Sequence, residues 1–228
     1  LKYGKNLAAP RTIDLFNSKK IIIREITGVF PHSIISTYSE DFYLYNRSNI
    51  GIIPKKNSEN NLLYILSVLN SKLIAYYFVK NTAKSVRKLF PKLILNDLRK
   101  FPFKNISPEA QQPFILKADL MLSLNKDLQE VSGKFQRNIQ REFGLQSLSG
   151  KFQSWHDLSY ADFLRELAKA KVSLTLSQKA EWEDYFTAEK QKALNLKQQI
   201  AATDNEIDRM VYELYGLTEE EIGIVEGE

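Results

Sequence analysis

The side chains best placed for chemistry in this sequence are basic, and most of them fall between residues 80 and 104. These 25 positions hold eight lysines and arginines against one acid, Asp97. Asn81, Thr82 and Ser85 are interleaved with them, and such side chains donate to phosphates or read base edges. The segment therefore predicts a polyanion-binding surface rather than a solvated basic loop. Its central candidates are Lys84, Arg87, Lys88 and Lys92.

Two smaller basic groups precede this segment, one near residue 20 and one near residue 55. Lysines that contact phosphates set affinity without base preference, whereas an arginine can read a guanine edge. We expect Arg87 to be such a base-reading residue. The secondary candidates for nucleic-acid contact are Lys19, Arg24, Lys55 and Lys56.

The motifs of several enzyme classes are missing from the sequence. It contains no glycine-rich phosphate loop and no dinucleotide-binding fingerprint. His32 and His156 lie in different segments without metal-ligand spacing, and there is no cysteine. A Glu-x-Lys triplet, typical of many nucleases, and an adjacent proline pair, needed in the turn of adenine methyltransferases, are also missing. We therefore expect no catalytic residue, no metal and no cofactor in this part of the protein.

Charge is divided unequally along the chain. Residues 1–107 hold 18 basic and six acidic residues, a net charge of +12, whereas residues 108–228 have a net charge of −7. A strongly basic segment attracts polyanions, and nucleic acid is the commonest such partner. The absence of cysteine and of a signal segment fits a cytoplasmic protein, and no apolar stretch is long enough for a bilayer. A first residue other than methionine suggests a fragment of a longer chain.

The first hundred residues predict short strands and one helix, which would carry the basic groups on a compact domain over residues 1–107. Ile21, Ile22 and Ile23 form a β-branched run typical of a buried strand. From Asn61 to Tyr76 apolar residues recur every three or four positions and indicate a helix. The expected strands are Lys20–Arg24, Ser33–Tyr38, Asp41–Tyr45 and Ile50–Ile53.

After Ser107 the pattern becomes helical. Pro108 and Glu109 suit the start of a helix, and an apolar stripe then runs to Phe143. A second stripe runs from Ser177 to Tyr215. Two such helices can return antiparallel and bury their stripes against each other, with a small helical cap at about residues 145–175. The predicted fold is α+β: a mixed α/β domain followed by a long coiled-coil-like hairpin over residues 108–228.

Four segments resemble the TaqI-like C-terminal specificity domains of type IIG and related restriction–modification enzymes, with an exit segment shared with type I specificity subunits. The tail, with its Val-Tyr-Glu-Leu-Tyr-Gly-Leu run, is the most specific of them. The Asn70-Ser71 pair in the second segment is interpreted as a helix-packing signature. The segments span residues 19–26, 64–73, 93–102 and 207–222.

This resemblance implies a target-recognition module that binds double-stranded DNA and serves catalytic domains of the same chain. Those domains would be an adenine-specific methyltransferase, with or without an endonuclease, and would hold S-adenosylmethionine and magnesium. Contact residues vary with the recognised site, so none is carried over. Two alternatives remain open: a structural coiled-coil or partner-docking module without specific DNA binding, and a small nuclease with an unfamiliar site.

Overall fold

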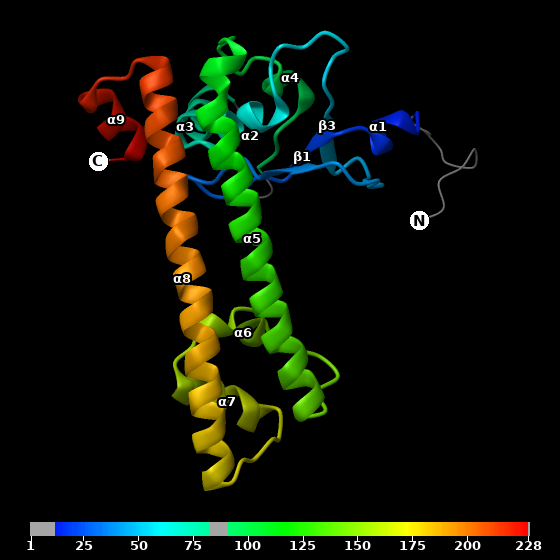
Figure 1. Ribbon diagram of the computed structural model, residues 1–228, viewed down its shortest axis with the longest axis vertical. Helices are drawn as coiled ribbons and strands as arrows, with labels where there is room; N and C mark the ends of the chain where they lie inside the picture. The colour runs from blue at the N-terminus through cyan, green and yellow to red at the C-terminus, as the bar shows by residue number, and fades with distance from the viewer. Residues whose placement is uncertain (1–11, 83–90, 228) are drawn as a thin grey trace. The chain divides into compact units, whose positions relative to one another are not determined.

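The computed structural model describes residues 12–82 and 91–227, and its contacts divide the chain into two compact units (Figure 1). The sheet unit comprises residues 1–122 and 203–228, and the helical unit comprises residues 123–202. The sheet unit contains, in chain order, α1 (Asp14–Asn17), β1 (Lys20–Arg24), β2 (Ser36–Ser39), β3 (Asn49–Ile52), α2 (Leu62–Asn70), α3 (Lys72–Asn81), α4 (Leu95–Leu98) and α9 (Glu219–Glu226). The helical unit contains α6 (Gly150–Gln153), η1 (Trp155–Asp157) and α7 (Tyr160–Lys169), while α5 (Pro108–Glu142) and α8 (Leu176–Tyr215) contribute to both units.

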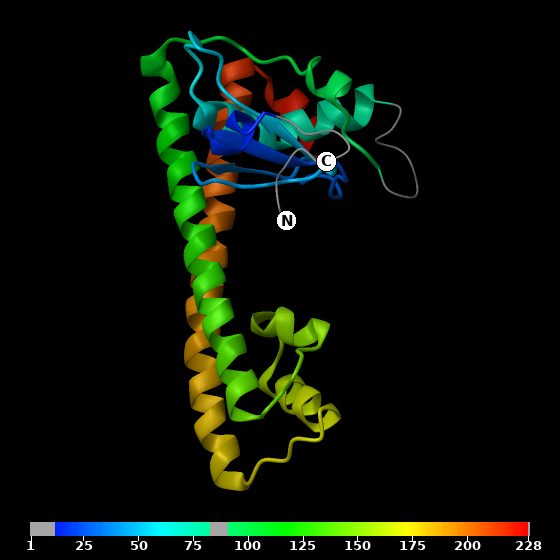
Figure 2. The ribbon, with the colours of Figure 1, turned by 90° about the vertical axis from the view of Figure 1, so that its right-hand side faces the viewer.

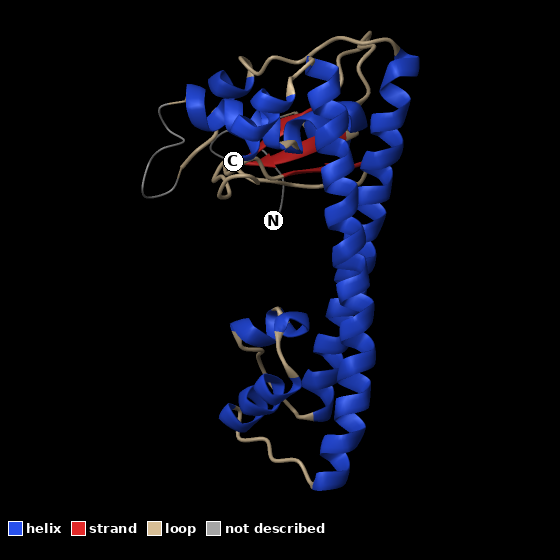
Figure 3. Cartoon of the chain, turned by 90° about the vertical axis from the view of Figure 1, so that its left-hand side faces the viewer, coloured by secondary structure: helices blue, strands red, loops and turns tan. Residues whose placement is uncertain are grey.

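The three strands form an antiparallel sheet in the order β2-β1-β3. Because side chains alternate along a strand, Ile21 and Ile23 point to one face, where both are 0% exposed. Helix α2 contacts β1 and β2 on this face, and Figure 2 shows α2 and α3 covering the sheet. The strands drawn red in Figure 3 are therefore half-covered by the helices of their own unit. The β-branched run forms the strand that its composition predicts.

On the sheet face opposite Ile21 and Ile23, a buried lysine binds the segments that cover one end. The Lys20 ammonium is 0% exposed and donates to the carbonyl oxygens of Phe16 (2.9 Å), Ser18 (3.0 Å) and Asp41 (2.6 Å). A buried charge requires such hydrogen bonds to offset its lost hydration. These bonds tie α1 and the β2–β3 loop to β1. Lys20 belongs to the basic group near residue 20, but its role is structural.

Two local expectations are wrong. Residues 41–45 form a loop, because the Asp41 carbonyl binds the Lys20 ammonium and Tyr45 packs edge-on against Phe16 at 5.2 Å. The single helix expected from Asn61 to Tyr76 is two helices separated at Ser71. Ser71 is extended, and its hydroxyl oxygen accepts a hydrogen bond from the backbone N–H of Ile74, which caps α3.

The core of the sheet unit contains residues from the first 122 positions and from the last part of α8. Val68 and Phe114 share one buried apolar cluster with Ile207 and Val211 near the end of α8. Lys117 of α5 also forms an ion pair with Glu206 of α8. The last residues of the chain are therefore part of the layer that covers the sheet.

The helical unit is built around aromatic side chains. Phe135 of α5 is 0% exposed and stacks on Trp155 at 3.7 Å and on Tyr185 of α8 at 5.6 Å between ring centroids. Phe163 of α7 and Phe186 of α8 complete the same cluster. Each unit thus packs a stretch of α5 against a stretch of α8. The predicted α+β class, with a mixed amino-terminal part followed by long helices, is confirmed.

The described helices differ from membrane-spanning segments in length or composition when each is taken alone. No single helix there is both long and apolar enough to cross a bilayer. Within the same ranges only α2 and α3 taken together reach that length and composition, and they are bent by 63° at the break between them.

Candidate nucleic-acid interface

Two of the predicted contact residues lie together at the carboxyl end of β1. Arg24 ends this strand, and two positions later Ile26 forms an antiparallel bridge with Lys92. Hydrogen bonds from Leu93 N to Glu25 O (2.9 Å) and from Thr27 N to Pro91 O (3.1 Å) hold the two segments side by side. Arg24 is exposed, while Lys92 pairs with Glu25 at 3.4 Å. Segments 66 residues apart in the chain thus meet at one basic edge.

The other described candidates lie toward the opposite end of the sheet. Lys19 precedes β1 and pairs with Glu40 at 2.9 Å, with both side chains more than half exposed. Lys55 and Lys56 follow β3, which runs antiparallel to β1, and both are exposed. At about 3.3 Å per residue, the five steps from Lys19 to Arg24 separate the two basic groups by about 17 Å.

The segment that carries most of the predicted charge is only partly described. Lys84, Arg87 and Lys88 lie outside the described residues. Of the other members, Lys80 lies over the ring of Tyr76, with its ammonium 5.4 Å from the ring centroid. Lys104 donates to the carbonyl oxygen of Leu214 at 2.7 Å, and its role is therefore structural.

The Asn70-Ser71-Lys72 turn connects the sheet to the tail of the chain. Asn70 accepts a hydrogen bond from the Ser36 hydroxyl (2.7 Å) and donates to the Ser36 carbonyl (3.2 Å), which anchors β2. The backbone N–H of Lys72 donates to Asp208 of α8 at 2.8 Å. This turn is therefore a junction of three elements, and its polar side chains are used within the fold.

The exit segment after α4 also binds the tail. The hydroxyl of Tyr215 donates to the carbonyl of Pro102, and the Lys104 ammonium lies 5.3 Å from the Tyr215 ring centroid. Tyr64 of α2 donates to the Lys104 carbonyl at 2.7 Å. The four segments that carry the sequence resemblance thus meet in one unit, although the last lies more than 100 residues beyond the third.

A buried carboxyl lies at the centre of this junction. Asp208 is 2% exposed, and burial raises the pKa of its carboxyl to about 6. Its neighbours include Asp204, whose pKa burial also raises, and the Lys72 ammonium, 3.6 Å from Oδ2. Lys72 also pairs with Glu226 of α9 at 3.1 Å, and this contact lowers the pKa of Glu226. One lysine thus faces three acids on α8 and α9.

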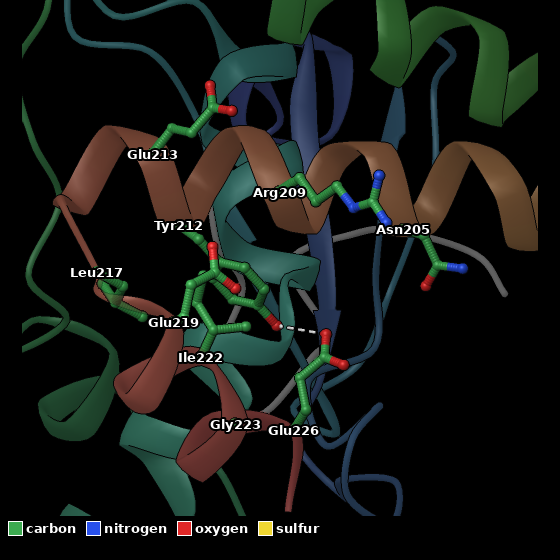
Figure 4. A pocket seen from close by; sticks show the side chains of 9 residues that line it. All are labelled: Asn205, Arg209, Tyr212, Glu213, Leu217, Glu219, Ile222, Gly223 and Glu226. Carbon is green, nitrogen blue, oxygen red and sulfur yellow. Dashed lines mark hydrogen bonds between the residues drawn. The ribbon is translucent and has the colours of Figure 1, made fainter. Parts of the chain in front are cut away.

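An acidic groove lies between α8 and α9 (Figure 4). It measures about 630 Å³, and the Tyr212 hydroxyl donates to Glu226 within it at 3.1 Å. Glu213 and Glu219 also line it, against one arginine, Arg209. Residues 203–228 hold nine acids and one basic residue, so the negative charge of the second half of the chain is concentrated here. Like charges repel, so a phosphate backbone is disfavoured in this groove.

Histidine and acidic side chains do not gather into a metal site in the described ranges: among residues 12–82 and 91–227, no three of them are grouped so as to hold a metal ion. Burial lowers the pKa of His156, whose ring contacts Trp155 in the helical unit, while His32 lies in the sheet unit. The candidate site is the group of basic residues around Arg24 and Lys92 at the carboxyl end of β1.

Comparison with known proteins finds a family model that matches the part of the chain that forms the sheet. Residues 1–103 match the TaqI-like C-terminal specificity domain. The resemblance predicted from the four segments is thereby confirmed for this part of the chain. Residues 107–211 match a second family model, described as a domain of unknown function, DUF8810. The matched residues include β1 to β3, α2, α3 and α4, and the range contains all eight predicted contact residues.

One curated relative supports the same assignment. It is a protein of Methanocaldococcus jannaschii whose name places it among type II restriction enzymes and methyltransferases. It is 28% identical over 131 residues, which cover 55% of this chain and 11% of the relative. The matched part of the chain covers about a tenth of the relative's length. No solved structure gives a significant match to the chain.

Sequence reasoning did not single out Asn49, which the sheet register places beside Arg24. The alternation of Ile21, Ile23 and Arg24 already indicates which face Arg24 occupies, but nothing local indicates its partner strand. It also treated the tail as part of a separate helical domain over residues 108–228. The Tyr215 hydroxyl donates to the Pro102 carbonyl and the Lys72 N–H donates to Asp208, so this tail contacts the sheet unit. The division at Ser107 stays a prediction.

Proposed function

We propose that this chain selects the DNA sequence on which a restriction–modification enzyme acts. The observation that carries the proposal is the basic edge of a TaqI-like specificity domain, where Arg24 and Lys92 meet beside the sheet. The surface charge of this edge contrasts with the acidic groove between α8 and α9. A duplex held by its phosphates would be oriented toward the basic edge and away from the acidic groove.

The rest of the protein would supply the chemistry. The relative's name supports a parent chain that methylates and cuts DNA. We propose an adenine-specific methyltransferase, with S-adenosylmethionine and, where a nuclease is present, magnesium bound by domains other than this one. Detection of N6-methyladenine in DNA treated with the parent enzyme and S-adenosylmethionine tests this part. Methylation of cytosine instead would contradict it.

Selection of bound duplexes from a randomised pool tests the recognition role directly. We expect the 228-residue chain to enrich a defined sequence, with an affinity that falls steeply as salt rises. Equal recovery of all sequences, or no binding at 50 mM salt, would contradict the recognition role. The partner-docking alternative would then be favoured.

A matched pair of variants locates the surface. Because Arg87 is the expected base-reading residue, the quadruple variant K84A/R87A/K88A/K92A should weaken binding to both duplexes, and more strongly to the specific one. Its salt slope should fall by about one unit for each phosphate that is no longer bound. The control K151A/R165A/K169A/K192A removes the same net charge from residues that pair with acids in the helical unit. It should leave the salt slope unchanged. Equal effects of the two variants would mean that only overall charge matters.

A further inference from the structure

The register of the sheet pairs an arginine with an asparagine on its second face. Arg24 of β1 lies directly opposite Asn49 of β3, two positions after the pair Ile22–Gly51. Paired residues of antiparallel strands point to the same face, and Ile23, which precedes Arg24, points into the core. Arg24 and Asn49 therefore stand side by side on the face away from α2.

Among the described residues, no element covers the Arg24 end of this face, whereas the other end is covered. At the Lys20 end, α1 and the Phe16–Tyr45 ring pair lie on the sheet. A Cβ atom at Gly51 would lie 1.9 Å from the Tyr45 hydroxyl oxygen, so the glycine lets this ring approach the strand. Thr37, which shares the cross-strand row of Gly51, is exposed, and in the next row Arg24 is exposed and Asn49 is half-buried. The accessible part of the face is thus the part that carries Arg24 and Asn49.

Neither side chain is engaged within the described part of the protein. Glu25, the acid next to Arg24 in the chain, pairs with Lys92 at 3.4 Å. In the described ranges, Arg24 has no ion pair, and the Asn49 amide has no hydrogen-bond partner. Both therefore keep their full set of donors and acceptors for a ligand.

The backbone that carries these side chains is held firmly. Arg24 N donates to Ile35 O at 3.0 Å, and Glu25 N donates to Ser48 O at 2.9 Å. Asn49 N donates to Asn46 O at 3.1 Å, and the Asn46 side chain accepts from Ser48 N at 3.0 Å. Side chains on a fixed backbone lose less freedom on binding, which favours discrimination between similar ligands.

Arginine and asparagine are the side chains that bind guanine and adenine with two hydrogen bonds each. Arginine donates to guanine O6 and N7, and asparagine pairs with adenine N6 and N7 in the major groove. Directly opposed residues have Cβ atoms about 5 Å apart, close to the roughly 3.4 Å step between stacked base pairs. A two-stranded antiparallel ribbon can enter the major groove, which is about 12 Å wide, and Arg24 and Asn49 lie on such a pair, β1 and β3.

We propose that Arg24 and Asn49 read two adjacent base pairs of the recognised sequence, a guanine and an adenine, from the major groove. This rests on the proposed DNA-recognition function and narrows it to two side chains and one dinucleotide. Lys92 and Lys19, each paired with a glutamate, are assigned to phosphates or to the fold rather than to bases.

Single substitutions measured on the selected duplex test the proposal. Arg24→Ala and Asn49→Ala should each weaken binding to that duplex by about 10- to 100-fold and leave random duplex binding nearly unchanged. Replacing the guanine in the duplex should remove the effect of Arg24→Ala only, and replacing the adenine should remove the effect of Asn49→Ala only. Arg24→Lys keeps the charge but loses the paired donors, so it should resemble Arg24→Ala in specificity.

The control is Arg99→Ala, which removes one exposed arginine at the end of α4 in the same unit and should leave base preference unchanged. Far-UV circular dichroism confirms that each variant is folded, and Arg24→Lys serves if Arg24→Ala is not. A wild-type chain that selects no sequence would overturn the proposed function itself. A wild-type chain that selects a sequence unaffected by Arg24→Lys and Asn49→Ala would overturn only the assignment of these two side chains.

Discussion

Different kinds of contact stabilise the interiors of the two units. The helical unit is one continuous stretch of 80 residues around Phe135, and its cluster is formed by rings. The sheet unit joins residues 1–122 to residues 203–228 through apolar contacts and the buried carboxyl of Asp208, which accepts from the Lys72 N–H. The difference teaches that a compact unit need not be continuous in sequence: the sheet unit is completed by the end of the chain.

Truncation should show this difference most strongly. A chain that ends at Ala202 loses Ile207, Val211 and the Asp208 carboxylate from the sheet unit, and each buried aliphatic side chain contributes about 2–5 kcal/mol. Because small domains are stable by only about 5–15 kcal/mol, we expect this unit to unfold. Loss of protected amides from β1 in hydrogen exchange would report it.

The matched control for truncation is an internal deletion. Residues 123–202 are replaced by a four-residue glycine–serine linker, which spans the 8–10 Å between packed helices. We expect the sheet unit of this variant to remain folded, because Lys117 and Glu206 already place the two helix segments side by side. A folded Ala202 truncation together with an unfolded deletion would reverse the comparison.

A core substitution in each unit should affect that unit alone. Phe135→Ala removes the ring at the centre of the aromatic cluster and should destabilise the helical unit by about 3–5 kcal/mol. Both tryptophans of the chain, Trp155 and Trp182, lie in this unit, so their fluorescence reports its unfolding. Phe78→Ala, at a position that is 1% exposed in the sheet unit, is the control and should not move the tryptophan transition. Equal shifts would show that the units unfold as one.

The Asp208 carboxyl should make the sheet unit pH-dependent. Its folded pKa of about 6 exceeds the unfolded value of about 3.9, so the folded state binds the proton more tightly and loses stability as pH rises from about 4 to 6. Asp208→Asn keeps an acceptor for the Lys72 N–H and removes this titration. Its stability relative to wild type should therefore rise by about 2–3 kcal/mol between pH 4 and 7.

Urea unfolding at several pH values measures this difference. Asp208→Ala is the control for the helix cap, because it also removes the acceptor at the start of α3 and should cost about 1 kcal/mol relative to Asp208→Asn at every pH. A constant difference between wild type and Asp208→Asn across this range would contradict the titration.

The smallest expected effect concerns the exposed lysines beyond β3. Lys55→Ala/Lys56→Ala should leave stability unchanged within about 0.5 kcal/mol, since both side chains are exposed. If both contact phosphates, the salt slope of DNA binding should fall by about two units. Lys179→Ala/Lys171→Ala, in the helical unit, is the charge-matched control. An unchanged slope for the first pair would restrict the DNA surface to the Arg24 edge.

Local sequence patterns determined much of this protein. The β-branched run at Ile21–Ile23 specified β1, and the three–four spacing of apolar residues specified α5 and α8. Such patterns work because alternation and helical periodicity depend on neighbours a few positions apart. The division at Ser107 rested on the same local change of period and stays a prediction, as do the eight contact residues.

Only the tertiary structure decided which distant residues meet. Nothing near Asn49 indicates that it faces Arg24, because strand register depends on the whole sheet and its turns. The break of one expected helix at Ser71 likewise depends on Asp208, which receives the Lys72 N–H from 136 residues away. Residues 41–45 form a loop because the buried Lys20 ammonium requires a hydrogen bond to the Asp41 carbonyl. That carbonyl is therefore not available for pairing in a fourth strand. Buried polar groups require hydrogen-bond partners, and these partners can lie far away in the sequence. A local sequence pattern therefore does not predict them.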